Sequence, residues 1–158
     1  VPNGKISYLK WFMVATAAAS ILLFATLTFN NSKSDGFYKD LVAENWPYEE
    51  GLPVKMSNKS IYDDAMNAYK LENWDEAERL LKPFNSDTSN YFLAIVAFQK
   101  ENLKIAVNYF QKVESNSNYY SEAQFRLALL SILEKDIQAA KRILRKLKAE
   151  NSSYSLEA

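Results

Sequence analysis

The sequence contains no cysteine and no histidine among its 158 residues. Their absence excludes disulfides, thiolate nucleophiles, zinc sites built from Cys and His, and imidazole acid–base catalysis. Only three glycines and four prolines are present, which leaves little material for a phosphate-binding loop or for many tight β-turns. Basic and acidic residues both number 19, so the net charge of zero gives no overall attraction to nucleic acid or anionic lipid. The composition favours an α-rich fold without metal or cofactor, in which local patches select the partners.

A long run without charged residues covers residues 11–29. At 1.5 Å per residue, a helix of this length spans roughly 28 Å, about the thickness of a hydrocarbon core. We therefore predict a single transmembrane helix over residues 11–30. A cleaved signal peptide is the alternative, but Thr26-Leu27-Thr28 matches an A-x-A-like cleavage site poorly. The chain begins with Val1 rather than Met, which indicates that sequence upstream is missing or removed.

Residues 31–57 form a linker that is too apolar to remain free in water. Its first part, around Phe37 and Leu41, suits a short amphipathic helix that ends before Pro47. The following residues, from Trp46 onward, are expected to run extended because prolines interrupt them. The segment also carries several carboxylates, and we expect it to dock on another part of the protein.

The second half of the chain contains an internal repeat. An aromatic or aliphatic residue is followed by alanine after three positions, and by a large apolar residue after four more. Another alanine precedes the alanine of each set by twelve positions. The spacing from the second unit to the third is 34 residues, whereas the spacing from the first to the second is 29. Pro83 explains the shorter first unit, because a proline inside the helix forbids its usual length. The small residues and the tryptophan that we expect at the helix contacts are Ala65, Trp74, Ala77, Ala94, Ala106, Ala128 and Ala140.

This spacing resembles the tetratricopeptide repeat (TPR), a helix-turn-helix unit of 34 residues with small residues at its eighth and twentieth positions. The chain departs from that pattern because the usual turn glycine, the tyrosine at the eleventh position and the closing proline are absent. The resemblance implies an all-α fold, in which a single N-terminal transmembrane helix precedes a three-unit TPR-like helical solenoid. The resulting divisions are an N-terminal flank, a transmembrane helix, a linker, a TPR-like domain and a flexible tail, at residues 1–10, 11–30, 31–57, 58–150 and 151–158.

In the resembled family, the first helix of each unit lines a concave groove. Carried over to this chain, the apolar and aromatic groove positions are Tyr62, Met66, Tyr69, Tyr91, Ile95, Phe98, Phe125, Leu129 and Ile132. A groove of this character fits an amphipathic helix or an extended apolar peptide. The linker could instead fill the groove through Phe37, Leu41, Trp46 and Tyr48, and the sequence leaves open which of the two occupies it.

The function expected from this reading is a non-catalytic, membrane-anchored scaffold that binds protein or peptide partners, for example within a membrane complex. The chain also resembles the C-terminal part of Bacteroidetes-type membrane TPR and anti-sigma-like proteins. That resemblance implies a bacterial inner-membrane location with a periplasmic repeat domain. Two alternatives stay open, namely the sensor half of an anti-sigma-type regulator and an ancillary subunit of a secretion or translocation machine. Acidic residues around Asp75 and a basic stripe around Arg145 leave self-association open, whereas nucleic acid is not expected as a partner.

Overall fold

A computed structural model describes residues 35–53 and 61–154, with side chains described for 36–53 and 61–150. The transmembrane helix predicted over residues 11–30 lies outside these ranges. Among the described residues no helix is both long and apolar enough to cross a membrane. All regular elements in this part of the chain are helical, without any strand, which confirms the all-α class for the residues described.

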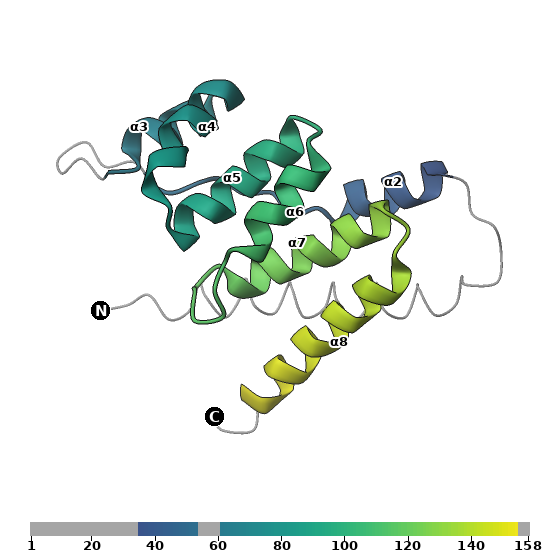
Figure 1. Cartoon of the computed structure of the whole chain (residues 1–158). Coiled ribbons are helices and arrows are strands. Elements are labelled where there is room, and N and C mark those ends of the chain that lie inside the picture. The colour runs from purple at the N-terminus through teal and green to yellow at the C-terminus, as the bar shows by residue number, and fades with distance from the viewer. Residues whose placement is uncertain (1–34, 54–60, 155–158) are drawn as a thin grey trace. The chain divides into compact units, whose positions relative to one another are not determined.

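Seven α-helices and one short 3-10 helix make up the described residues (Figure 1). Their bounds are α2 Asp35–Asn45, α3 Asp63–Lys70, α4 Trp74–Leu81, η1 Lys82–Phe84, α5 Asp87–Gln99, α6 Leu103–Gln111, α7 Tyr120–Leu133 and α8 Ile137–Tyr154. The predicted helix before Pro47 is confirmed by α2, and three pairs of helices lie in the region 58–150 where the repeats were predicted. One end was predicted wrongly: α8 was expected to stop near residue 150, but it continues to Tyr154.

The same three-residue turn joins α3 to α4, α5 to α6 and α7 to α8. Its middle residue is left-handed in each case, with φ of 56° at Glu72, 60° at Glu101 and 62° at Lys135. The amide of this residue donates to the carbonyl three positions back, and the next amide donates to the carbonyl five positions back. These two bonds satisfy the last carbonyls of the first helix in a Schellman arrangement. The turn residues are 29 and 34 positions apart, so the backbone repeats with the same spacing as the alanines.

Short side-chain caps and a proline set the beginnings and ends of the helices near these turns. The Asn73 side chain accepts a hydrogen bond from the Glu76 amide at 3.4 Å, and Asp136 accepts one from the Ala139 amide at 2.8 Å. The α4 helix ends at Leu81, where Pro83 tightens the chain into the 3-10 turn η1. The expected early end of this helix at the proline is therefore confirmed.

Helix α5 is buried on all sides over nine consecutive residues from Ser89 to Ala97, and the last seven of these are apolar or aromatic. A helix of this kind is found in the middle of a helical fold, since it has no face suited to water. Its N-terminus is closed by a capping box in which Ser86 and Ser89 exchange hydrogen bonds of 3.1 and 2.8 Å. Helices α4 and α6, which precede and follow α5 in the chain, both contact it (Figure 1).

The chain divides into two compact units, and the boundary falls inside α7. Of the described residues, unit 1 holds 35–46 and 124–154, and unit 2 holds 47–53 and 61–123. Unit 1 has its own core, formed by one residue of α2 together with residues of α7 and α8. These buried residues are Val42, Phe125, Ala128, Leu129, Ile132, Ala140, Leu144 and Leu147.

Candidate functional site

The nine predicted groove residues are largely covered in the structure. Seven of them are buried, and Tyr62 and Phe98 are half-buried. The seven buried residues are Met66, Tyr69, Tyr91, Ile95, Phe125, Leu129 and Ile132. Residues from the N-terminal stretch 36–53 contact several of these side chains, and they do so differently in the two units.

In unit 1 the covering element is the helix α2. Val42 is 2% exposed and belongs to the same buried cluster as Phe125, Leu129 and Ile132. Tyr38 and Leu41 pack against this cluster as partly buried side chains. Burial of apolar surface therefore holds α2 on helices α7 and α8.

Directly after the end of α2, a tryptophan contacts an arginine of α7. Arg126 of α7 is 1% exposed, and its guanidinium carbon lies 5.0 Å from the centre of the Trp46 ring. A cation over an aromatic face at this distance is attracted by the ring quadrupole. Trp46 is half-buried, and the contact fixes the point at which the chain leaves α2.

In unit 2 the covering element is extended. We name the segment Pro47–Pro53 the strap. Its Glu49 carbonyl accepts a hydrogen bond from the Tyr69 hydroxyl at 3.2 Å, and the Glu49 carboxylate accepts one from the Tyr91 hydroxyl at 2.9 Å. The Leu52 amide donates to the Met66 sulfur at 3.3 Å. Three predicted groove residues thus bind one short stretch of the chain.

Gly51 allows the strap to lie close to the helices. Its φ is +79°, a conformation that residues with a side chain rarely adopt. A Cβ added there would lie 3.2 Å from Cδ1 of Tyr69 and 3.4 Å from the sulfur of Met66. A residue with a side chain at this position would therefore crowd Tyr69 and Met66.

Aromatic contacts fix the position of the hydroxyl group of Tyr91. Its ring stacks on Tyr119 with centroids 4.6 Å apart, and it makes edge contacts with Phe92 at 5.3 Å and Phe110 at 5.9 Å. Burial raises the pKa of the Tyr119 hydroxyl, and the nearby negative charge of Glu49 raises this pKa further. The Tyr119 hydroxyl, which stacks beside Tyr91, therefore remains neutral at neutral pH.

Tyr62 lies at the edge of this aromatic group. Its hydroxyl is 2.6 Å from the Ser86 hydroxyl, and its ring packs on Phe84 with centroids 4.7 Å apart. The residue that caps α5 thus also positions one of the predicted groove tyrosines.

The four predicted groove-filling residues have different places in the structure. Leu41 packs on the unit 1 cluster, and Trp46 packs on Arg126, while Phe37 is half-buried with its ring edge-on to Tyr38 at 5.5 Å. Tyr48 does not fill the groove, because its side chain is 87% exposed. The strap alternates along its length, so that Glu49 and Gly51 turn inward where Tyr48 and the exposed Glu50 turn outward.

Sequence reasoning did not identify Glu49, Gly51 or Arg126 as contact residues. Glu49 is one of several carboxylates in the linker, and a carboxylate one residue away from a tyrosine in an extended segment points to the opposite side. One signal was available for Gly51, since it is one of only three glycines in the chain and lies between two prolines. No signal in the sequence separates Arg126 from exposed basic residues.

The predicted packing residues are buried at the helix contacts, with the tryptophan at their margin. The exposed fractions of the alanines lie between 0% and 2%: Ala65, Ala77, Ala94, Ala106, Ala128 and Ala140. Trp74 is half-buried and meets the edge of Tyr69 with ring centroids 5.5 Å apart. Tyr69 in turn contacts Phe92 at 5.4 Å, which connects this tryptophan to the aromatic group around Tyr91.

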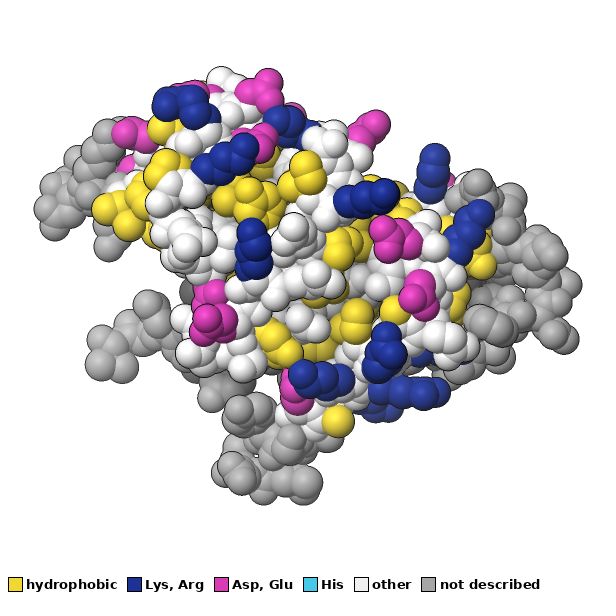
Figure 2. Space-filling model, in the orientation of Figure 1, with side chains coloured by type: hydrophobic (Ala, Val, Ile, Leu, Met, Phe, Trp, Pro, Cys, Tyr) yellow, Lys and Arg dark blue, Asp and Glu magenta, His cyan; other side chains and the backbone are white. Residues whose placement is uncertain are grey.

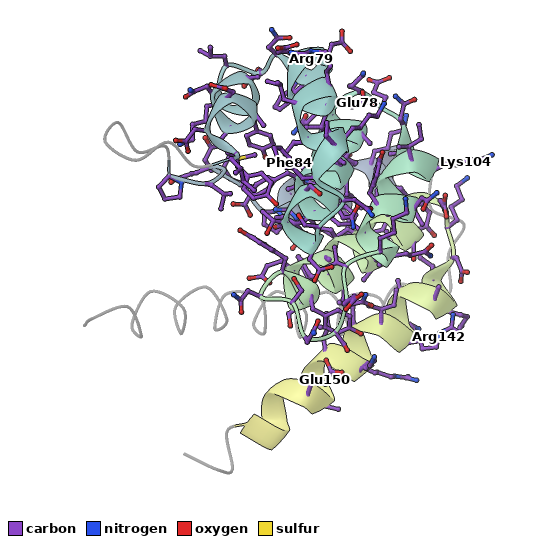
Figure 3. All side chains as sticks on the ribbon, turned by 60° about the vertical axis from the view of Figure 1, so that its left-hand side comes forward. Glu78, Arg79, Phe84, Lys104, Arg142 and Glu150 are labelled. Atoms are coloured by element: carbon purple, nitrogen blue, oxygen red, sulfur yellow. The ribbon has the colours of Figure 1, made fainter. Side chains whose placement is uncertain are left out.

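The acidic residues of α4 are paired with cations inside unit 2. Lys100 binds both Asp75 and Glu78 at 2.6 Å, Arg79 binds Glu76 at 2.6 Å, and the carboxylates project from α4 as Figure 3 shows for Glu78. Hydrogen bonding to Lys100 holds the pKa of Glu78 below its usual value. These pairs reduce the negative charge that α4 offers to the basic stripe of another copy.

Helix α8 presents the opposite charge. The basic side chains gather over this helix in Figure 2. Arg142, Arg145 and Lys148 are exposed, and Lys146 lies 3.7 Å from Glu150 of the same helix. The stripe is therefore a solvated face of α8, opposite the buried Leu144 and Leu147.

Within the described ranges, no three acidic side chains come together in a way that could hold a metal ion. No family model matches the chain, and neither a curated protein nor a solved structure shows significant similarity to it.

Proposed function

We propose that this chain is a non-catalytic, membrane-anchored scaffold with a TPR-like solenoid, which binds a protein or peptide partner in the groove formed by the first helices of its hairpins. The observation that carries the proposal is the strap in unit 2, where the buried Tyr91 hydroxyl binds the carboxylate of an extended segment at 2.9 Å. A groove that binds an extended segment of its own chain has the hydrogen-bonding groups needed to bind another one.

The repeated geometry supports the TPR-like part of the proposal. Three helical hairpins have the same left-handed turn residue, the same pair of turn hydrogen bonds and a buried alanine in each helix. Each of these features recurs at the 29- and 34-residue spacing of the sequence. Helical hairpins that recur at a fixed spacing in this way are the building unit of solenoid proteins.

The membrane part of the proposal depends on the apolar run at residues 11–29 and on no structural observation. We propose a single-pass protein of the bacterial inner membrane with the repeat domain in the periplasm. Alkaline carbonate extraction tests the anchor: the full chain stays in the membrane pellet, and a chain that starts at residue 31 is released. Release of the full chain would contradict the anchor.

Photo-crosslinking in membranes of the source cells tests partner binding. A photoreactive phenylalanine analogue replaces Tyr62, a half-buried tyrosine at the edge of the groove. The matched control carries the same analogue at Tyr109, a half-buried tyrosine of α6 in the same unit. We expect a crosslinked protein from position 62 that position 109 does not give. Identical products from both positions, or none from position 62, would contradict the proposal.

A further inference from the structure

The strap contacts unit 2 through groups that are each specific for one position. Glu49 supplies both a carbonyl and a carboxylate, Gly51 supplies the close approach, and Leu52 supplies an amide. The neighbouring Tyr48 and Glu50 are exposed. The strap residues that unit 2 recognises are therefore a carboxylate residue, a glycine two positions later, and the residue after that glycine.

The receiving side of this contact is rigid. Tyr91 is 0% exposed and its ring is enclosed by three other aromatic rings, so its hydroxyl donates from a fixed point. Tyr69 is 5% exposed, and Met66 is 0% exposed. Because its three ring contacts hold Tyr91 in one orientation, the hydroxyl is preorganised for the acceptor that the strap presents.

We infer that unit 2 recognises an extended peptide segment of a partner protein with the pattern acidic residue, any residue, glycine, and then a residue whose backbone amide can donate a hydrogen bond. Glu49-Glu50-Gly51-Leu52 is then an internal copy of this ligand, which occupies the site until the partner segment displaces it. The inference rests on the proposed function, since it names the kind of partner that the groove binds. The tether keeps the internal copy at a high effective concentration, so a partner must compete with it.

Substitutions that weaken the binding of the strap make the site accessible to an added peptide, whose affinity can then be measured. In the full chain, Gly51→Ala places a Cβ 3.2 Å from the Tyr69 ring and strains a backbone with φ of +79°. Glu49→Gln is a second variant, which weakens the bond to Tyr91 without changing the side-chain volume. A fluorescent peptide of residues 47–53, capped at both ends, is titrated into each variant and into the unchanged chain. We expect it to bind both variants at least about tenfold more tightly than the unchanged chain.

Two peptide variants with the same change of charge decide whether recognition follows the proposed pattern. The peptide with Glu49→Gln loses the carboxylate that meets Tyr91, and we expect its affinity for the Gly51→Ala chain to fall about tenfold or more. The peptide with Glu50→Gln changes the exposed neighbour and should bind like the original. Equal binding by the two peptides would overturn the inference, as would failure of the original peptide to bind either variant chain whose far-ultraviolet circular dichroism is unchanged.

Two further results separate the inference from related explanations. If the unchanged chain is a dimer in which residues 47–53 crosslink between copies, the strap is a swapped element, and the inference of a separate partner is overturned. Position-specific crosslinking from Tyr62 together with failed peptide binding would reject the pattern and leave the scaffold function standing. A different result is that the peptides bind in the expected order while position 62 gives no crosslinked partner. That result would support the recognition pattern and count against the scaffold function.

Discussion

Unit 1 is covered by a helix, whereas unit 2 is covered by an extended segment, although both covers come from the same stretch of 36–53. The helix α2 contributes apolar area through Val42, and this contribution depends on size and hydrophobicity. The strap contributes hydrogen bonds from Glu49 and a close backbone approach at Gly51, and these depend on particular atoms. A helical cover is therefore suited to permanent packing, and the extended cover is suited to selective and reversible binding.

The largest effect should come from placing a charge under the helical cover. Val42→Asp puts a carboxylate into a site that is 2% exposed and surrounded by Phe125, Leu129 and Ile132. An uncompensated buried charge costs about 3–5 kcal/mol. We expect the free energy of unfolding of unit 1 to fall by this amount, as measured by urea denaturation with hydrogen exchange resolved by segment.

The neighbouring exposed Ala43 gives the matched control for this change. Ala43→Asp adds the same charge to the same helix on its solvent side, and it should alter stability by less than about 0.5 kcal/mol. Equal losses of stability from both variants would show that α2 is sensitive to charge rather than to burial. The contrast drawn between α2 and the strap would then be wrong.

A smaller effect should distinguish the two tyrosines that bind the strap. Tyr91→Phe removes a hydrogen bond to a carboxylate, which contributes about 1.5–3 kcal/mol. Tyr69→Phe removes one to a neutral carbonyl, which contributes about 0.5–1.5 kcal/mol. Both variants keep the ring, and hydrogen exchange at the Leu52 amide reports opening of the strap. We expect faster exchange in both, with the larger increase for Tyr91→Phe, and the reverse order would show that the carboxylate is not the main anchor.

The shared turn gives a prediction that can be tested in unit 2. Glu101 has a φ of 60°, where a side chain is unfavourable and glycine is not. Glu101→Gly should raise the midpoint of thermal unfolding by an amount equivalent to about 0.5–1 kcal/mol. Gln99→Gly is the control, because Gln99 is an exposed residue at the end of α5 and glycine is disfavoured inside a helix. Stabilisation by both glycines would exclude the left-handed turn as the cause.

The smallest effect concerns the ion pairs on α4. Because hydrogen bonds from Lys100 and Lys82 lower the pKa of Glu78 in the folded state, the stability they contribute is present above pH 4.5, its ordinary value, and is lost as the pH falls through the lowered value. Glu78→Gln should remove this dependence and cost less than about 1 kcal/mol at pH 7. Urea denaturation at pH 7 and pH 3 measures it, and the difference should nearly vanish in 1 M salt. A difference that persists in salt would contradict a screened surface pair.

The helices could be predicted because their signals are local. The alternation of alanine with large apolar residues indicated paired helices, and Pro83 marked the end of α4. The predicted groove residues were chosen by their position within each repeat. The residues that cover them were less predictable: Trp46 and Tyr48 were expected to fill the groove, yet Tyr48 is 87% exposed and the contacts in unit 2 are made by Glu49 and Gly51. Size indicates what gains from burial, but it does not indicate which side of an extended chain faces the helices.

The amino-acid sequence by itself determined the all-α class, the repeat spacing and the residues that line the first helices, because each depends on neighbours within a few turns of the chain. Only the tertiary structure decided what lies on those residues. The strap meets its partners across 20 and 42 positions of sequence, through two hydrogen bonds at Glu49. Such contacts depend on where a buried hydroxyl points, and that direction is set by the packing of the rings around Tyr91.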